Sequence, residues 1–170
     1  VYKRQQAAAR PAELAWTTAD ATGVGGNRLE PNGVIDPECG ILAVRRHGTD
    51  VFIAVSVIYA MHPTVIHENT PLLSSDFPHY TRLHIRERFG DELPVTYHTA
   101  PCGNQSPRYC VNGQTFEEAE RLGRKLGRAV VASIEQLQDG DFSAGCQLGG
   151  ALAQVALPRR PVPSVAAAEK

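Results

Sequence analysis

The sequence lacks any apolar run long enough to cross a membrane, and it lacks a surplus of charge of either sign. Its 17 lysines and arginines nearly balance 18 aspartates and glutamates, which gives a formal net charge of −1. Nucleic-acid-binding proteins carry a basic patch or stripe, and acidic interaction tails carry a block of like charges. Neither pattern is present, so we expect no nucleic-acid partner and no transmembrane segment in this chain.

Cysteine is also scarce, and the four cysteines stand at positions 39, 102, 110 and 146. None belongs to a CxxC pair, which excludes the usual cysteine cage of a structural zinc site. Cys102 and Cys110 could form a disulfide or remain reduced, buried thiols, and the sequence leaves both open. The glycines of residues 23–26 lack GxGxxG spacing and do not begin a helix, which excludes a dinucleotide-binding loop.

Apolar residues make up 42% of the 170 positions, enough for the core of a single domain or part of one. The most apolar stretch, residues 51–61, is rich in β-branched residues and predicts a strand buried on both faces. Pro63 cannot continue a central ladder, so this strand should end at about His62. A histidine at the end of a buried strand lies where α/β proteins commonly build their sites.

The remaining periodicity predicts an α/β or α+β fold in which helices flank a mixed sheet. One helix is expected from 77 to 89, after an N-cap at residues 74–76, and another from 116 to about 138, after a capping box of Thr115 and Glu118. An antiparallel hairpin is expected around the tight connection at 47–50. The predicted strands cover residues 12–21, 40–46, 51–61, 94–99 and 146–157.

Most of the side chains that could bind a metal ion or take part in catalysis lie in three loops that adjoin these strands. The loops contain Asn27-Arg28, Met61-His62-Pro63-Thr64 and Gly103-Asn104-Gln105-Ser106-Pro107-Arg108. Each loop taken alone is typical of an ordinary turn, in which asparagine and serine side chains bond the nearby backbone. Their order along the chain is more informative than any one of them.

In this order the three loops resemble the neutral/alkaline ceramidase family, zinc-dependent amidases that cleave the N-acyl bond of sphingolipids. The resemblance runs from about residue 11 to residue 157. It implies that His62, in a His-Pro-Thr motif, binds zinc, that Ser106 is the active-site serine and that Arg28 is an active-site arginine. It also implies a zinc cofactor and a lipid amide or other small-molecule substrate. Members of the family are often secreted.

Two positions of the serine loop depart from the family pattern. Asn104 stands where the ceramidases carry aspartate, and Arg108 stands where they carry asparagine. Both changes make the loop more positive, so a ceramidase-like hydrolase of another substrate fits better than a ceramidase proper, and both residues are candidates for substrate binding. Asp76 is expected either to orient His62 or to cap the helix that follows it.

A catalytic zinc needs three or four protein ligands and an open position for water. The family's other ligands come from an upstream HxH-type segment and from a downstream glutamate and tyrosine, which have no matching positions here. We therefore expect residues 6–158 to be part of a catalytic domain that, alone, binds zinc weakly and is inactive. Residues 1–5 resemble a translated transposon end from sequencing-library preparation, residues 6–10 the last turn of a helix, and residues 159–170 a Pro- and Ala-rich tail or edge extension.

Two other functions remain open from the sequence. A serine esterase of the α/β-hydrolase kind requires Gly-x-Ser-x-Gly, and Asn104 and Arg108 occupy both glycine positions around Ser106. A non-catalytic α/β binding module, in which the loops are only turns, belongs to a different class. An amidase hydrolyses N-acyl substrates and loses this activity when a chelator is added, whereas the binding module hydrolyses nothing.

Overall fold

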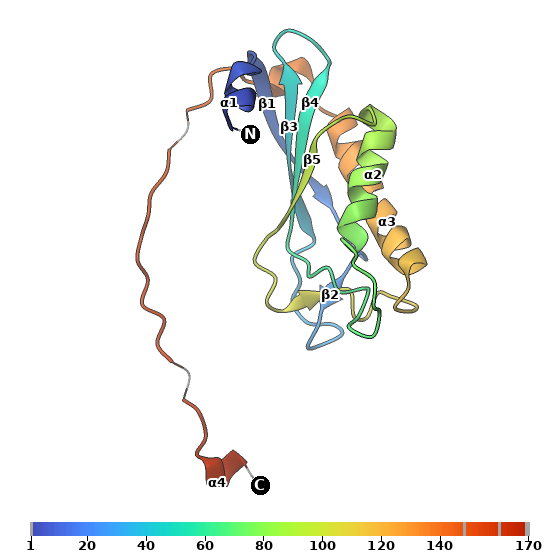
Figure 1. Cartoon of the computed structure of the whole chain (residues 1–170), viewed down its shortest axis with the longest axis vertical. Helices are drawn as coiled ribbons and strands as arrows, with labels where there is room; N and C mark the ends of the chain where they lie inside the picture. Colours follow the sequence, from blue (N-terminus) through green and yellow to red (C-terminus); the bar gives the residue numbers. More distant parts are fainter. Residues whose placement is uncertain (1, 148, 160, 169–170) are drawn as a thin grey trace.

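The computed structural model describes residues 2–147, 149–159 and 161–168, and its centre is a four-stranded sheet beside two long helices (Figure 1). In spatial order the strands are β1 (Ala12–Asp20), β3 (Glu38–Arg46), β4 (Phe52–Tyr59) and β5 (Val95–Thr99). β3 is antiparallel to both β1 and β4, and β4 is parallel to β5. The predicted mixed sheet and the β3–β4 hairpin are confirmed.

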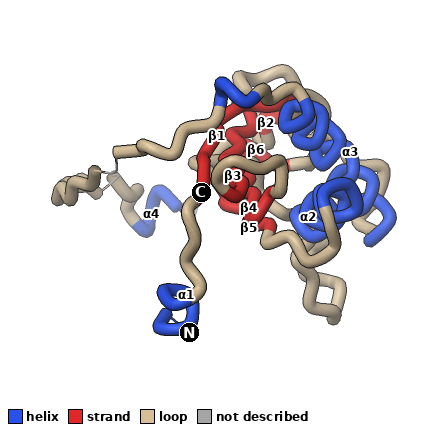
Figure 2. The backbone as a smooth tube through the Cα atoms, turned by 90° about the horizontal axis from the view of Figure 1, so that it is seen from above, coloured by secondary structure: helices blue, strands red, loops and turns tan. Residues whose placement is uncertain are grey.

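Helices α2 (Phe77–Phe89) and α3 (Phe116–Glu135) lie together on one side of the sheet (Figure 2). The predicted apolar stripe of α3 supplies much of the core, with Leu122, Leu126 and Val130 fully buried. The two helices approach closely at Gly123, where an added Cβ would lie 2.6 Å from the Cβ of Tyr80 and nearer still to the backbone of Phe77. A larger residue at this crossing would force the helices apart.

The N-terminus of α3 follows the predicted capping pattern with one change of partner. The hydroxyl of Thr115 accepts a hydrogen bond from the N–H of Glu118 at 3.3 Å. The carboxylate of Glu118 accepts from the N–H of Asn112 at 3.1 Å, where a capping box would use the N–H of Thr115. An ion pair with Arg121, followed by this backbone bond, lowers the pKa of Glu118 to about 2.

In the part of the chain that the structure describes, no helix covers the other face of the sheet, so the prediction that β4 is buried on both faces is wrong. Buried Val55, Val57 and Tyr59 alternate along β4 with half-exposed residues. The reason is that α2, which connects the parallel strands β4 and β5, and α3, which packs along α2, both cover the same face. Trp16 of β1 lies on the open face and is 59% exposed.

The predicted strand over residues 146–157 is wrong for the residues that the structure describes, and position 148 lies outside them. After a short 3-10 helix, η1 (Asp139–Asp141), Ser143 forms two backbone hydrogen bonds of 2.9 Å with Leu14 at the sheet edge. The chain then leaves the sheet (Figure 1), because its weak alternation and two adjacent glycines provide no continuous apolar face. Leu152 and Leu157 are exposed.

Short helices lie near the two ends of the described chain, α1 (Tyr2–Ala7) and α4 (Val165–Ala168). The expectation that residues 6–10 form the last turn of a helix is wrong for residues 8–10, because α1 ends at Ala7. All four cysteines are free thiols, and Cys39 and Cys102 are buried. Burial raises the pKa of the Cys39 thiol to about 12. Among the described residues, no helix combines the length and apolar character needed to span a membrane.

Candidate active site

Three loops that leave the sheet at the same end form the candidate site. Strands β1, β4 and β5 all run in one direction, so their carboxyl ends lie at one edge of the sheet. The loops that follow them contain Arg28, His62 and Ser106 in turn, at the end of the molecule that carries β2 in Figure 1. Open α/β sheets commonly bind ligands beyond the carboxyl ends of their strands.

Two very short strands fasten the first and third loops together. β2 (Gly26–Asn27) pairs antiparallel with β6 (Gln105–Ser106). Next to this ladder, the N–H of Arg28 donates to the carbonyl of Asn104 at 2.8 Å, and the guanidinium of Arg108 donates to the carbonyl of Arg28 at 3.1 Å. A two-residue strand has no hydrophobic period, so this pairing was not predicted from the sequence.

A cavity of about 350 Å³ opens between the loops. Three of the predicted site residues line it: Arg28, Ser106 and Arg108. The other lining residues are Thr64, His67, Val111 and Gln114. The cavity therefore brings together side chains from loops about 80 positions apart, and its described wall contains no carboxylate.

His62 does not line this cavity, but it is bonded to the strand that does. The Nδ1 atom of its ring lies 3.0 Å from the backbone carbonyl oxygen of Gln105. The backbone N–H of His62 donates to the same oxygen at 3.4 Å. A carbonyl oxygen only accepts, so the neutral ring carries its proton on Nδ1 and leaves Nε2 free as an acceptor. Metal-binding histidines typically have this arrangement, with one ring nitrogen donating to a carbonyl and the other facing the ion.

Gln105 is the residue that sequence reasoning did not single out. It is buried, its Oε1 accepts from the N–H of Asp36 at 2.7 Å, and its Nε2 donates to the carbonyl of Ala60 at 2.8 Å. Both polar ends of the side chain are therefore satisfied within the protein. Its place between Asn104 and Ser106 was visible, but nothing local showed that its side chain points inward to the end of β4.

Asp76 and Asn104 lie outside the cavity wall. The two carboxylate oxygens of Asp76 accept from the N–H groups of Ile66 and Phe77, at 2.8 and 2.7 Å, and the residue has a positive φ of 55°. The bond from Phe77 is that of the N-cap of α2, one of the two roles considered for Asp76, and the bond from Ile66 holds the preceding loop. The carbonyl of Gln105, not Asp76, is the group that meets the His62 ring. Asn104 is exposed, and its side chain donates to the carbonyl of Val34 at 3.3 Å.

Ser106 is buried at the end of β6, and its hydroxyl oxygen accepts from the N–H of Arg108 at 3.3 Å. Within the described residues no histidine or carboxylate is hydrogen-bonded to this hydroxyl. A serine nucleophile needs an adjacent general base within hydrogen-bonding reach. The geometry of Ser106 therefore suits a hydroxyl that donates a hydrogen bond to a ligand. It does not provide the base that would activate the serine as a nucleophile.

The described part of the chain holds no group of three or more histidine, cysteine, aspartate or glutamate side chains placed to bind a metal ion. His62 fits one position of such a site, because its free Nε2 and bonded Nδ1 are those of a typical ligand. A complete catalytic site needs at least two more protein ligands.

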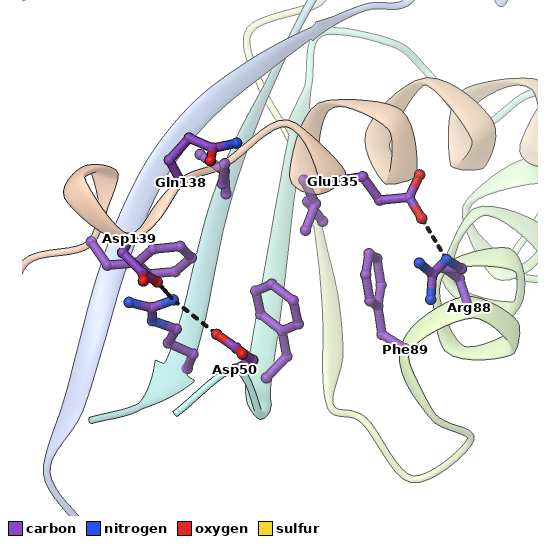
Figure 3. Close-up of a pocket in the computed structure, with 11 residues that line it drawn as sticks. Asp50, Arg88, Phe89, Glu135, Gln138 and Asp139 are labelled. Carbon is purple, nitrogen blue, oxygen red and sulfur yellow. Dashed lines mark hydrogen bonds and ion pairs between the residues drawn. The ribbon is translucent and has the colours of Figure 1, made fainter. Parts of the chain in front are cut away.

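A second cavity, of about 420 Å³, lies at the opposite end of the sheet, beside the β3–β4 turn (Figure 3). Arg45 is buried there, 2.8 Å from both Glu13 and Asp139 and stacked 3.8 Å from the ring centre of Phe142. These carboxylates raise the pKa of Arg45, with the bond to Asp139 as the main cause. Its charged groups are already paired, so we interpret this cavity as structural.

The fold and the site together define a class, an α/β domain with a mixed sheet and a cavity built from loops at the carboxyl ends of its strands. Solved structures with this fold include a ceramidase complexed with C2 (TM-score 0.67, 17% identity) and the neutral ceramidase from Pseudomonas aeruginosa (TM-score 0.65, 17% identity). Each comparison covers 79% of this chain and 24% of the ceramidase chain, so the similarity spans about a quarter of those proteins. No protein-family model and no curated protein sequence matches the chain. The resemblance to ceramidases is confirmed at the level of the fold.

Proposed function

We propose that this chain is part of the catalytic domain of a ceramidase-like, zinc-dependent amidase that cleaves the amide bond of an N-acyl lipid or a related substrate. One observation carries the proposal. Arg28 and Ser106 line one cavity, and His62 is bonded to Gln105, the residue next to Ser106. Two of the three motif residues thus line one cavity and the third is bonded to the segment beside it, in a fold shared with two ceramidases.

In this proposal Nε2 of His62 is one zinc ligand, and the others come from outside the described residues. A zinc ion held there would lower the pKa of a water molecule, so that this water could attack the amide. Arg28 and the Ser106 hydroxyl would donate hydrogen bonds to the amide oxygen as negative charge develops on it. One such donor typically changes kcat by roughly 10²–10³-fold.

The test uses the longer protein that contains this chain, supplied with N-acyl substrates. We expect hydrolysis that is lost with a chelator and with His62→Ala, and a kcat about 100-fold lower in Ser106→Ala. Ser75→Ala, an exposed serine away from the cavity, serves as the control.

Two other results would redirect the assignment. A stable, metal-free protein without hydrolytic activity would favour the binding module. Hydrolysis that resists a chelator but is lost in Ser106→Ala would favour the serine esterase.

A further inference from the structure

We propose that the cavity between Arg28 and Arg108 binds an oxyanion, so that the substrate is an N-acyl compound with a carboxylate or a phosphate near its amide. This inference rests on the function proposed above and narrows its substrate class. The proposed substrate differs from a neutral sphingolipid, which carries no negative charge for a second arginine, Arg108, to bind.

The charge of the cavity wall is the first argument. Arg28 and Arg108 both line the cavity, and none of the other lining residues is acidic. Every other polar side chain of the wall can donate a hydrogen bond to an anion: Thr64, His67, Ser106 and Gln114. The site therefore combines two fixed positive charges with neutral or basic donors.

The second argument is that these two arginines lack acidic partners. Elsewhere in the fold, Arg45, Arg121 and Arg124 each pair with at least one carboxylate at 2.7–2.8 Å. Within the described residues neither Arg28 nor Arg108 forms an ion pair. Two like charges that line the same cavity repel each other, and an anion bound between them would relieve that repulsion.

Geometry supports the same conclusion. Nη1 of Arg108 donates to the backbone carbonyl of Arg28 at 3.1 Å, which holds the guanidinium at the cavity wall although the residue is exposed. The planar guanidinium retains further N–H groups, and such forks match the two oxygens of a carboxylate or phosphate. Ser106, two residues before Arg108 in the same loop, adds a hydroxyl to the cavity wall.

The test measures binding to the isolated chain by calorimetry, with chelator present, so that neither metal nor turnover contributes. N-hexanoylglycine is compared with N-hexanoylglycinamide, which differs in lacking the negative charge. The phosphate ester of N-hexanoylethanolamine is compared with N-hexanoylethanolamine itself. We expect at least one acid to bind about tenfold more tightly than its neutral partner, and the pair that shows the larger ratio identifies the oxyanion.

Variants test whether the two arginines cause the preference for the acid. Arg108→Gln and Arg28→Gln should each remove most of the preference, and Arg108→Lys should retain part of it because the charge remains. Arg128→Gln, which removes an exposed charge on α3 away from the cavity, should bind like the parent. Circular dichroism and thermal melting confirm that each variant is folded.

Equal affinity for acid and neutral partner would overturn the inference, as would a preference that survives both glutamine variants or no binding at millimolar ligand. These outcomes are separable from failure of the proposed function. If the longer protein hydrolyses neutral N-acyl amides as well as acidic ones, the oxyanion site is wrong and the proposed amidase activity stands. If the protein prefers anions but has no amidase activity, the oxyanion site stands and the proposed function is wrong.

Discussion

The ring of His62 and the backbone of Gln105 meet across 43 positions of sequence, with Nδ1 lying 3.0 Å from the carbonyl oxygen. This contact sets the tautomer of the neutral ring and leaves Nε2 available. It joins the loop after β4 to the loop after β5, the two parallel strands of the sheet. The candidate metal ligand is therefore oriented by the segment that carries the candidate active-site serine.

Zinc binding by the chain alone should be weak, because His62 is a single ligand and the described residues contain no three-residue metal group. We expect a dissociation constant weaker than micromolar by calorimetry, and a further loss in His62→Ala. His79→Ala, an exposed histidine on α2, serves as the control. Micromolar or tighter binding by the parent chain would contradict this prediction.

Gln105→Leu should lower the free energy of unfolding by about 2 kcal/mol, because the N–H of Asp36 and the buried carbonyl of Ala60 both lose their partners. Denaturant unfolding measures the change. Gln114→Leu makes the same substitution at an exposed position of the cavity wall and should change stability by no more than about 0.5 kcal/mol. Equal effects of the two variants would show that the Gln105 side chain does not hold the loops.

Gly123→Ala should destabilise the fold by about 1–3 kcal/mol through overpacking, because its Cβ would meet the backbone of Phe77 and the Cβ of Tyr80. The gain in helix propensity offsets only part of this cost. Gly140→Ala has open space around the added methyl and serves as the control in thermal or denaturant unfolding. A Gly123→Ala variant as stable as the parent would mean that α2 and α3 do not pack this closely.

Glu118 should make stability depend on acidity. Its pKa is about 2 in the folded chain, below the ordinary value of 4.5, mainly because of Arg121. The unfolded state then binds more protons between these values, so the stabilisation is complete above about pH 4.5 and disappears as the pH falls toward 2. Unfolding measured against pH should show Glu118→Gln less stable than the parent at pH 7, with the difference shrinking below pH 4.5. Glu92→Gln, an exposed glutamate, should follow the parent at every pH.

The open face of the sheet should promote self-association. Trp16 is 59% exposed there, and half-buried apolar residues of three strands surround it: Leu14, Leu42, Val44 and Ile58. Contiguous apolar surface of this kind favours association. Sedimentation at increasing concentration should show Trp16→Thr associating less than the parent, and the tryptophan fluorescence of the parent should be open to quenchers. A parent chain that is monomeric at all concentrations would count against this expectation.

Much of the fold was predictable because its signals are local. Thr115 and Glu118 mark the start of α3, and the apolar stripe that follows repeats with the helical period. Alternating or β-branched runs marked the strands of the main sheet, and Pro63 limited the length of β4. The same signal misled where it was weak, in residues 146–157, since alternation alone does not provide a neighbouring strand.

The sequence by itself determined the two long helices, the strands of the main sheet, and Arg28, His62 and Ser106 as candidates. The helices and strands follow from local patterns, and the three candidates follow from the order of their loops along the chain, which resembles that of the ceramidase family. Only the tertiary structure decided which loops touch, because the order and direction of the strands set which of their ends meet. The β2–β6 pairing, the inward side chain of Gln105 and the joining of Arg28 with Arg108 all depend on that order. So does the open face, which exists because both helices cover the same side of the sheet.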